Sequence, residues 1–155
     1  CAEIIKHQTS QDGRSNVVTL GQQRFRILEI IRETPFPTAM VGWIEDEVVK
    51  DLDQLNKLAE SVKIALKDVV ELTSKLTDSE TTLPDDLPQL PRELSYWIGA
   101  HLGGPVAEEQ QHLLEMVNTI KRLEREFEML DHTRRQLAAR TALKETLSNV
   151  DQSNN

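Results

Sequence analysis

The chain has 155 residues, a formal net charge of -8, 38% hydrophobic residues, 28% charged residues and a single cysteine, Cys1. This length is sufficient for one domain with an apolar core, and the negative charge argues against nucleic acid as a partner because phosphate backbones would be repelled. No apolar run approaches the roughly 18 residues that a membrane-spanning helix needs. One cysteine excludes an internal disulfide, which fits a reducing compartment.

The first 47 residues have the pattern of short antiparallel strands. The expected strands cover residues 2–8, 16–20, 24–31 and 38–45. An Asp12–Gly13 pair between the first two strands favours a hairpin turn. Pro35 and Pro37 interrupt the second pair, because proline has no N–H to donate to a ladder. Four short strands bury little surface, so we expect them to belong to a larger sheet or barrel.

The next expected element is one long helix, from about Val48 to Leu76. Apolar residues recur there at alternating spacings of four and three, which places them on one helical stripe. The stripe consists of Val48, Leu52, Leu55, Ala59, Val62, Leu66, Val69 and Leu76. At 1.5 Å per residue such a helix is roughly 43 Å long. The acidic residues 45–47 precede it and complement the dipole of a helix N-terminus.

A proline-rich loop, 77–91, separates this helix from three further helical segments. Pro91 can open a short helix, which Gly103–Gly104–Pro105 would end. Its apolar face is formed by Leu94, Trp97, Ile98 and Leu102. A short helix over 106–116 continues, or restarts near Asn118, into a long final helix. The buried stripe of that helix is expected at Ile120, Leu123, Phe127, Leu130 and Leu137, interrupted by Arg134.

This pattern predicts a β-rich subdomain over 1–47, a helical subdomain over 48–148 and a frayed tail over 149–155. The fold class is therefore α+β.

No arrangement of residues predicts an enzyme. None of the six glycines precedes a lysine, so a phosphate-binding loop of the Gly-Lys-Ser/Thr type is absent from the sequence. The four histidines are scattered, without the short His or Cys spacing of a zinc site, and no serine lies in a glycine-flanked turn that would expose a nucleophile. We therefore expect no catalytic residue, no cofactor and no metal.

Aromatic and sulfur-containing side chains near the proline turn are the candidates for a binding surface. Phe36, Met40 and Trp43 lie where an extended polypeptide could add to a sheet edge. The alternative, which residue type alone favours, is that they pack as core residues under the first helix. The same core interpretation applies to Tyr96 and Trp97. Basic residues of the last helix alternate with acids, which favours a solvated face with ion pairs.

The sequence also resembles a known family. The stretch "TLGQQRFRILEI" is similar to the one that closes the first β subdomain of the N-terminal domain of Lon proteases. The helical half, "LPQLPRELSYWIGAHLGGPVAEEQQHLLEMVNTIKRLEREFEML", resembles the same domain, with Gln110 or Gln111, residues 113–115 and Arg122–Leu123 at the positions of its motifs. The similarity runs from Cys1 to about residue 147. "ELSYWI", "LEREFEML" and "LAARTALKETL" look most like the stand-alone Lon-domain proteins of cyanobacteria and plastids.

The resemblance implies the β-rich part of a PUA-like barrel followed by a helical subdomain with a long C-terminal helix. It also implies a non-catalytic module that recognises polypeptide substrates or acts as an adaptor or subunit, in a chloroplast stroma or cyanobacterial cytoplasm. The family's domain opens with a "PLFPL"-like strand and a "FE.RYR" helix that this sequence lacks, so the chain looks like the latter two-thirds of the domain.

Two alternatives to the binding module remain. In the first, the chain is the N-terminal fragment of a complete ATP-dependent Lon protease, whose ATPase and Ser–Lys peptidase modules are not present here. In the second, it is a purely structural subunit whose first-helix stripe docks on a partner helix.

Overall fold

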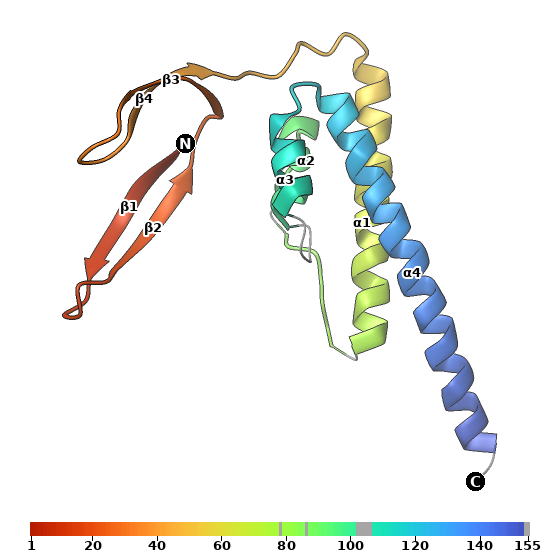
Figure 1. Ribbon diagram of the computed structural model, residues 1–155. Coiled ribbons are helices and arrows are strands. Elements are labelled where there is room, and N and C mark those ends of the chain that lie inside the picture. Colours follow the sequence, from red (N-terminus) through yellow and green to blue (C-terminus); the bar gives the residue numbers. More distant parts are fainter. Residues whose placement is uncertain (78, 86, 102–106, 154–155) are drawn as a thin grey trace. The chain divides into compact units, whose positions relative to one another are not determined.

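The computed structural model describes residues 1–77, 79–85, 87–101 and 107–153 (Figure 1). They belong to two compact units, Cys1–Asp46 and Glu47–Asn155, whereas the expected division follows residue 47. Strands occupy the first unit and helices the second, so the predicted α+β class is confirmed.

The first unit consists of two antiparallel hairpins. Strand β1 (Ala2–Thr9) pairs with β2 (Ser15–Gly21), and β3 (Phe25–Arg32) pairs with β4 (Thr38–Trp43). Gly13 lies in the first turn with a φ of 83°, the left-handed region that glycine enters without steric cost. The Asp-Gly pair in the sequence therefore predicts this turn correctly, because the turn needs a residue that can adopt a positive φ.

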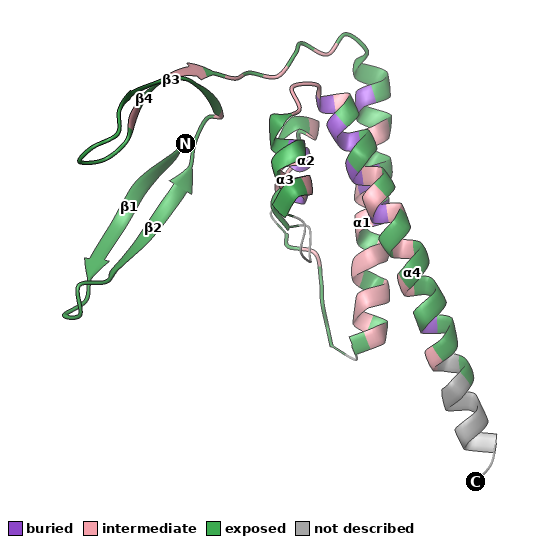
Figure 2. Cartoon of the chain, viewed as in Figure 1, coloured by how far each residue is buried: buried purple, intermediate pink, exposed green. Residues whose placement is uncertain are grey.

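The hairpins remain two separate sheets. No ladder joins them, and the register of each shifts at a bulge, after Ile4 in β1 and after Ile27 and Ile30 in β3. No side chain of residues 1–46 is fully buried, and Figure 2 shows these strands mostly in the colour of exposed residues. Residues 1–46 by themselves therefore close no barrel.

Helix α1 (Leu52–Thr77) begins later than its apolar pattern predicts. Asp51 is its N-cap: the carboxylate Oδ1 accepts a hydrogen bond of 2.8 Å from the backbone N–H of Gln54, which has no partner within the helix. The predicted start at Val48 is wrong, and this side chain is 91% exposed. Val48 has the spacing of the apolar stripe, but it lies before Asp51, the N-cap after which the helix begins.

The three later helices are α2 (Pro91–His101), α3 (Ala107–Glu115) and α4 (Thr119–Ser153). Asn118 separates α3 from α4, because its side-chain oxygen accepts a 3.1 Å hydrogen bond from the N–H of Lys121 and so caps α4. The chain therefore restarts at Asn118 rather than continuing.

Two expectations at the helix ends have different outcomes. Leu102, expected on the apolar face of α2, lies outside the described residues. The tail expected to fray from residue 149 is helical as far as Ser153.

The helical unit has its core between α1, α2 and α4. The buried apolar residues of this core are Leu55, Ala59, Val62, Ala65, Leu94, Ile98, Leu123 and Leu130. Most of them belong to the predicted stripes, which are confirmed in their central parts. Helices α1 and α4 run in the same direction, since Asp68 contacts Arg134 and the last turn of α1 contacts Lys144 (Figure 1).

Candidate functional site

The three residues predicted to contact polypeptide are all exposed, by 60% for Phe36, 48% for Met40 and 59% for Trp43. They are therefore not core residues of the strand unit, and their role in polypeptide contact stays a prediction. The structure also separates them. Trp43 ends β4, Met40 is three residues away and so points to the other face of the strand, and Phe36 lies in the turn with the Arg32 guanidinium 4.9 Å from its ring centre.

Trp43 instead belongs to an apolar face to which β3 also contributes. The alternation in the sequence puts Phe25 and Ile27 on one side of β3, and the register adds Trp43 and Val41. Residues opposite each other in a ladder share a face, and the register pairs Phe25 with Trp43, Ile27 with Val41, and Ile30 with Ala39. We call Phe25, Ile27, Ile30, Val41 and Trp43 the β3–β4 apolar face. Ile27 and Ile30 are each 57% exposed, and the rings of Phe25 and Trp43 meet edge to face at 6.4 Å.

The other face of this hairpin is more polar. It carries Arg26 opposite Gly42 and Glu29 opposite Met40, and the Leu28 side chain covers Gly42, 3.5 Å from where a Cβ would be. Each strand of the hairpin has one ladder partner among the described residues. The other edge of each strand is therefore not paired with a strand there. The hairpin therefore offers an amphipathic, two-edged surface.

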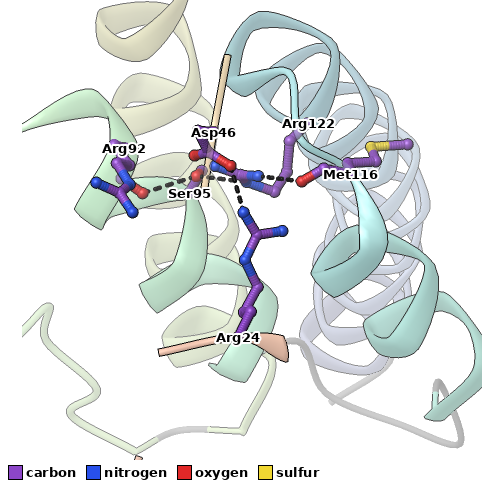
Figure 3. Close-up of polar contacts among 6 residues, drawn as sticks. All are labelled: Arg24, Asp46, Arg92, Ser95, Met116 and Arg122. Atoms are coloured by element: carbon purple, nitrogen blue, oxygen red, sulfur yellow. Dashed lines mark hydrogen bonds and ion pairs between the residues drawn. The ribbon is translucent and has the colours of Figure 1, made fainter. Parts of the chain in front are cut away.

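An ion pair ties the open end of this hairpin. Arg24 Nη2 lies 2.5 Å from Asp46 Oδ1, and both side chains are largely buried (Figure 3). The N–H of Ile44 donates a hydrogen bond of 3.0 Å to the Arg24 carbonyl. The pair continues the β3–β4 connection beyond Phe25 and Trp43. The sequence suggested that Asp46 serves a helix N-terminus, whereas the structure assigns it this partner in the hairpin.

The helical unit contains a buried polar cluster around Arg122, which is fully buried in α4. Its Nε donates to Ser95 Oγ at 2.8 Å, its Nη1 donates to the Met116 carbonyl at 2.7 Å, and the Ser95 hydroxyl donates to the Arg92 carbonyl at 2.8 Å (Figure 3). The guanidinium carbon also lies 4.0 Å from the ring centre of Tyr96. Buried arginine is tolerated because these partners replace water.

Glu126, one turn after Arg122, is the second buried charged residue of α4. Neither carboxylate oxygen has a hydrogen-bond partner among the described residues, and a Cβ on Gly99 would lie 3.8 Å from Oε1. Burial raises the pKa of the Glu126 carboxyl to about 9, although the positive charge of Arg122 acts in the opposite direction. Glu126 is therefore a neutral acid near pH 7. The sequence interpretation missed it because only apolar residues were used to define the stripe.

Helix α3 is held on α4 by a two-point ion pair. Arg125 Nε and Nη2 donate to the two oxygens of Glu109 at 2.6 and 3.1 Å. This hydrogen bonding lowers the pKa of Glu109 and raises that of Arg125. Gln110 adds a 3.1 Å hydrogen bond to the Gly99 carbonyl of α2.

The described part of the chain contains no group of three or more His, Cys, Asp or Glu side chains that could hold a metal ion. The histidines have separate surroundings: His7 lies beside Ser15, for example, and the ring of His101 stacks on Trp97 at 4.0 Å. In the same described residues, no helix combines the length and apolarity of a membrane span.

Comparison with protein families gives a match over residues 1–132 to the substrate-binding domain of ATP-dependent protease La (LON). The chain belongs to this family. The matched family is a substrate-binding domain, not an ATPase or a peptidase. The Lon resemblance of the sequence is therefore confirmed.

Curated relatives of this Lon substrate-binding domain are Lon proteases. The Lon protease of Anaeromyxobacter dehalogenans and Lon protease 2 of Myxococcus xanthus are each 29% identical over 133 residues, which is 86% of this chain and 16% of theirs. The Lon protease of Methylocella silvestris is 26% identical over 134 residues, covering 79% of this chain and 15% of its own. The chain thus spans about one sixth of the length of these relatives.

Proposed function

We propose that this Lon substrate-binding domain binds extended or unfolded polypeptides through the β3–β4 apolar face. The observation that supports the proposal is the exposure of Ile27, Ile30 and Trp43 together on one side of a two-stranded sheet. A polypeptide can add to an outer edge by main-chain hydrogen bonds, while its apolar side chains contact this face.

The small area of the β3–β4 apolar face favours a moderate affinity for polypeptides. Burial of a large apolar side chain contributes about 1.5–3 kcal/mol, and a bound polypeptide loses conformational freedom that offsets part of this gain. A surface of a few such residues therefore favours weak and reversible capture, which is compatible with release of many different chains. The Phe25–Trp43 contact and the Arg24–Asp46 pair hold the hairpin end in shape before binding.

The experiment is a titration of a fluorescently labelled, permanently unfolded polypeptide with the domain, read by fluorescence anisotropy. The test variant is Ile27→Ser, which changes the apolar face. The matched control is Met40→Ser, on the opposite face of the same hairpin. We expect at least a tenfold weaker affinity for Ile27→Ser and less than a twofold change for Met40→Ser. Equal effects of the two variants, with both still folded by circular dichroism, would contradict the proposal.

A second candidate is that the chain acts as the substrate-binding part of an ATP-dependent protease. It is supported by the relatives, which are Lon proteases several times longer than this chain. Sequencing of the gene downstream of codon 155 tests it: an ATPase motif in the same reading frame supports the protease, and a stop codon supports the separate module.

For a separate module, two roles can be distinguished by capture of the full-length protein from native extract and measurement of intact complex masses. Stoichiometric partners of fixed mass support an adaptor or structural subunit, and many substoichiometric chains support substrate capture. A location in a chloroplast stroma or cyanobacterial cytoplasm, and the absence of nucleic acid among the partners, are further proposals that rest on the sequence resemblance and on the charge of -8.

A further inference from the structure

The core of the helical unit lies at one end of the parallel α1–α4 pair. Helix α2 packs at this end, and among the residues of α1 and α4 whose burial the structure describes, the buried apolar ones lie between 55 and 65 or between 123 and 130. We call residues 66–77 of α1 and 131–146 of α4 the distal half of the pair. Figure 2 shows the change along α4 from buried to mostly exposed residues, and in the described part of the distal half only Thr141 is buried.

The facing stripes of α1 and α4 contain polar residues in the distal half. Thr73 on α1, and Arg134, Thr141 and Lys144 on α4, occupy stripe positions that carry apolar residues nearer the core. The hydroxyl of Thr73 donates to the Val69 carbonyl and that of Thr141 to the Leu137 carbonyl, each within its own helix. These two bonds therefore do not link the helices.

Apolar contact in this half is partial, with Leu66 and Val69 only half-buried against the core. The hydrogen bonds and ion pairs that link the helices here are partly exposed. Arg134 Nη1 lies 3.1 Å from Asp68 Oδ2, with both side chains about two-fifths exposed. Lys144 Nζ donates to the carbonyls of Lys75 and Leu76, at 3.2 Å each, and so caps the end of α1. Exposed ion pairs contribute little to stability because water and salt screen them and the side chains lose freedom.

An open groove of about 440 Å³ also runs beside this half, lined by Leu72 and Ala138 together with charged side chains of both helices. The distal half thus buries less apolar surface per turn than the core end does, and its polar links compete directly with water. The free energy that separates the closed pair from a locally opened pair should therefore be smaller here.

We propose that the distal half of the α1–α4 pair opens as one cooperative unit while the core end remains folded. In the open form α4 beyond Leu130 leaves α1, and both helices lose their mutual contacts at the same time. The part of α4 farther from the core is then a segment that opens and closes while the rest of the helical unit stays folded.

Native-state hydrogen exchange, resolved by mass spectrometry of the whole chain, tests this proposal. We expect amides of residues 70–77 and 137–144 to exchange through a common opening at least 100-fold more often than amides of residues 120–130. The test variant is Thr73→Leu, which places an apolar side chain on the α1 stripe. It should slow exchange in residues 137–144 of the other helix by at least tenfold. The matched control is Lys67→Leu, at an exposed position of the same helix.

Two results would overturn the proposal. The first is equal protection of both halves, which means that the pair opens only as a whole. The second is ordinary fraying, in which exchange in α4 rises gradually toward its C-terminus, α1 remains protected, and Thr73→Leu changes only α1. The cross-helix effect of Thr73→Leu separates cooperative opening from fraying, since a fraying end of α4 is not affected by α1.

Discussion

Arg122 and Ser95 are joined inside the helical unit by a hydrogen bond of 2.8 Å from the guanidinium Nε to the hydroxyl oxygen. The Ser95 hydroxyl in turn donates a hydrogen bond to the Arg92 carbonyl, so this small side chain satisfies a buried cation of α4 and a backbone acceptor of α2 at the same time. A buried donor that loses its acceptor retains the full cost of its desolvation. Ser95 should therefore matter more for stability than its size suggests.

The variant Ser95→Ala is expected to lower the free energy of unfolding by about 1–3 kcal/mol, because the Nε–H of Arg122 loses this acceptor. Urea unfolding at pH 7 measures the change. Ser61→Ala is the control: its hydroxyl bonds to the Lys57 carbonyl of its own helix at an exposed site. The control should differ from the parent by less than about 0.5 kcal/mol. A Ser95→Ala protein as stable as the control would show that Arg122 finds another acceptor.

The buried carboxyl of Glu126 makes stability depend on pH. Its folded-state pKa of about 9 exceeds the ordinary value of 4.5, so the folded state holds a proton that the unfolded state releases between these values. Stability contributed by the neutral acid is therefore full below about pH 4.5 and declines as pH rises toward 9. One proton gives a slope of up to about 1.4 kcal/mol per pH unit.

Glu126→Gln should remove this slope. Between pH 6 and pH 8 we expect the parent to lose up to about 2–3 kcal/mol of unfolding free energy more than the variant does. Urea unfolding at several pH values measures both curves. Glu124→Gln, which changes an exposed acid on the same helix, should leave the slope of the parent intact. If the curves of parent and Glu126→Gln are parallel, the Glu126 carboxyl is ionised in the folded protein.

Leu123 tests where the core lies. The side chain is fully buried between the helices, so Leu123→Ala should lower the free energy of unfolding by about 2–5 kcal/mol through lost burial and the cavity left behind. Leu143→Ala removes the same atoms from a position of the same helix that is 64% exposed, and should cost less than about 0.5 kcal/mol. Thermal and urea unfolding of the pair measure the difference, and similar costs would mean that the core extends along α4.

Glu109 tests how α3 is attached. In Glu109→Gln the two-point pair with Arg125 is lost, and because both side chains are partly exposed we expect a global cost of at most about 1 kcal/mol. The local effect should be clearer, with faster hydrogen exchange of α3 amides. Since the pKa of Glu109 is lowered in the folded state, its contribution is present above the unfolded pKa and disappears as pH falls through the folded value.

The control for this variant is Glu128→Gln. Glu128 also contacts Arg125, at 3.3 Å, but it lies on α4 itself and is more exposed than Glu109. Its loss should leave α3 exchange unchanged. Equal acceleration of α3 exchange in both variants would mean that the charge of Arg125, rather than its link to α3, controls this helix.

Local signals in the sequence were sufficient for most of the elements. Alternating apolar residues and the Asp12–Gly13 turn place the strands to within a few residues, because strand and turn preferences act over short stretches. The stripe around Val62 identifies the core of α1 for the same reason. Val48 shows the limit of such patterns, since an apolar residue at the right spacing does not start a helix that Asp51 caps.

Contacts between residues far apart in the chain could not be predicted from the sequence. An apolar stripe shows that a helix has a partner but does not show its direction, so the parallel pairing of α1 and α4 could not be predicted. Nor could the β3–β4 apolar face, which depends on the register that sets Phe25 against Trp43. The exposure of Trp43 contradicts the general tendency of aromatic residues to be core, because its surroundings, not its type, decide its burial.

The parallel arrangement of α1 and α4 has a consequence for how the chain reaches its fold. Asp68 and Arg134, which meet across the pair, are 66 residues apart in sequence, and Lys75 and Lys144 are 69 apart. Helix α1 is synthesised before α4, so the part of its apolar stripe that packs on α4 stays uncovered until α4 exists. Contacts of such long sequence separation slow folding because a large loop must close first. The helical unit therefore completes its core during synthesis only after α4 has been made.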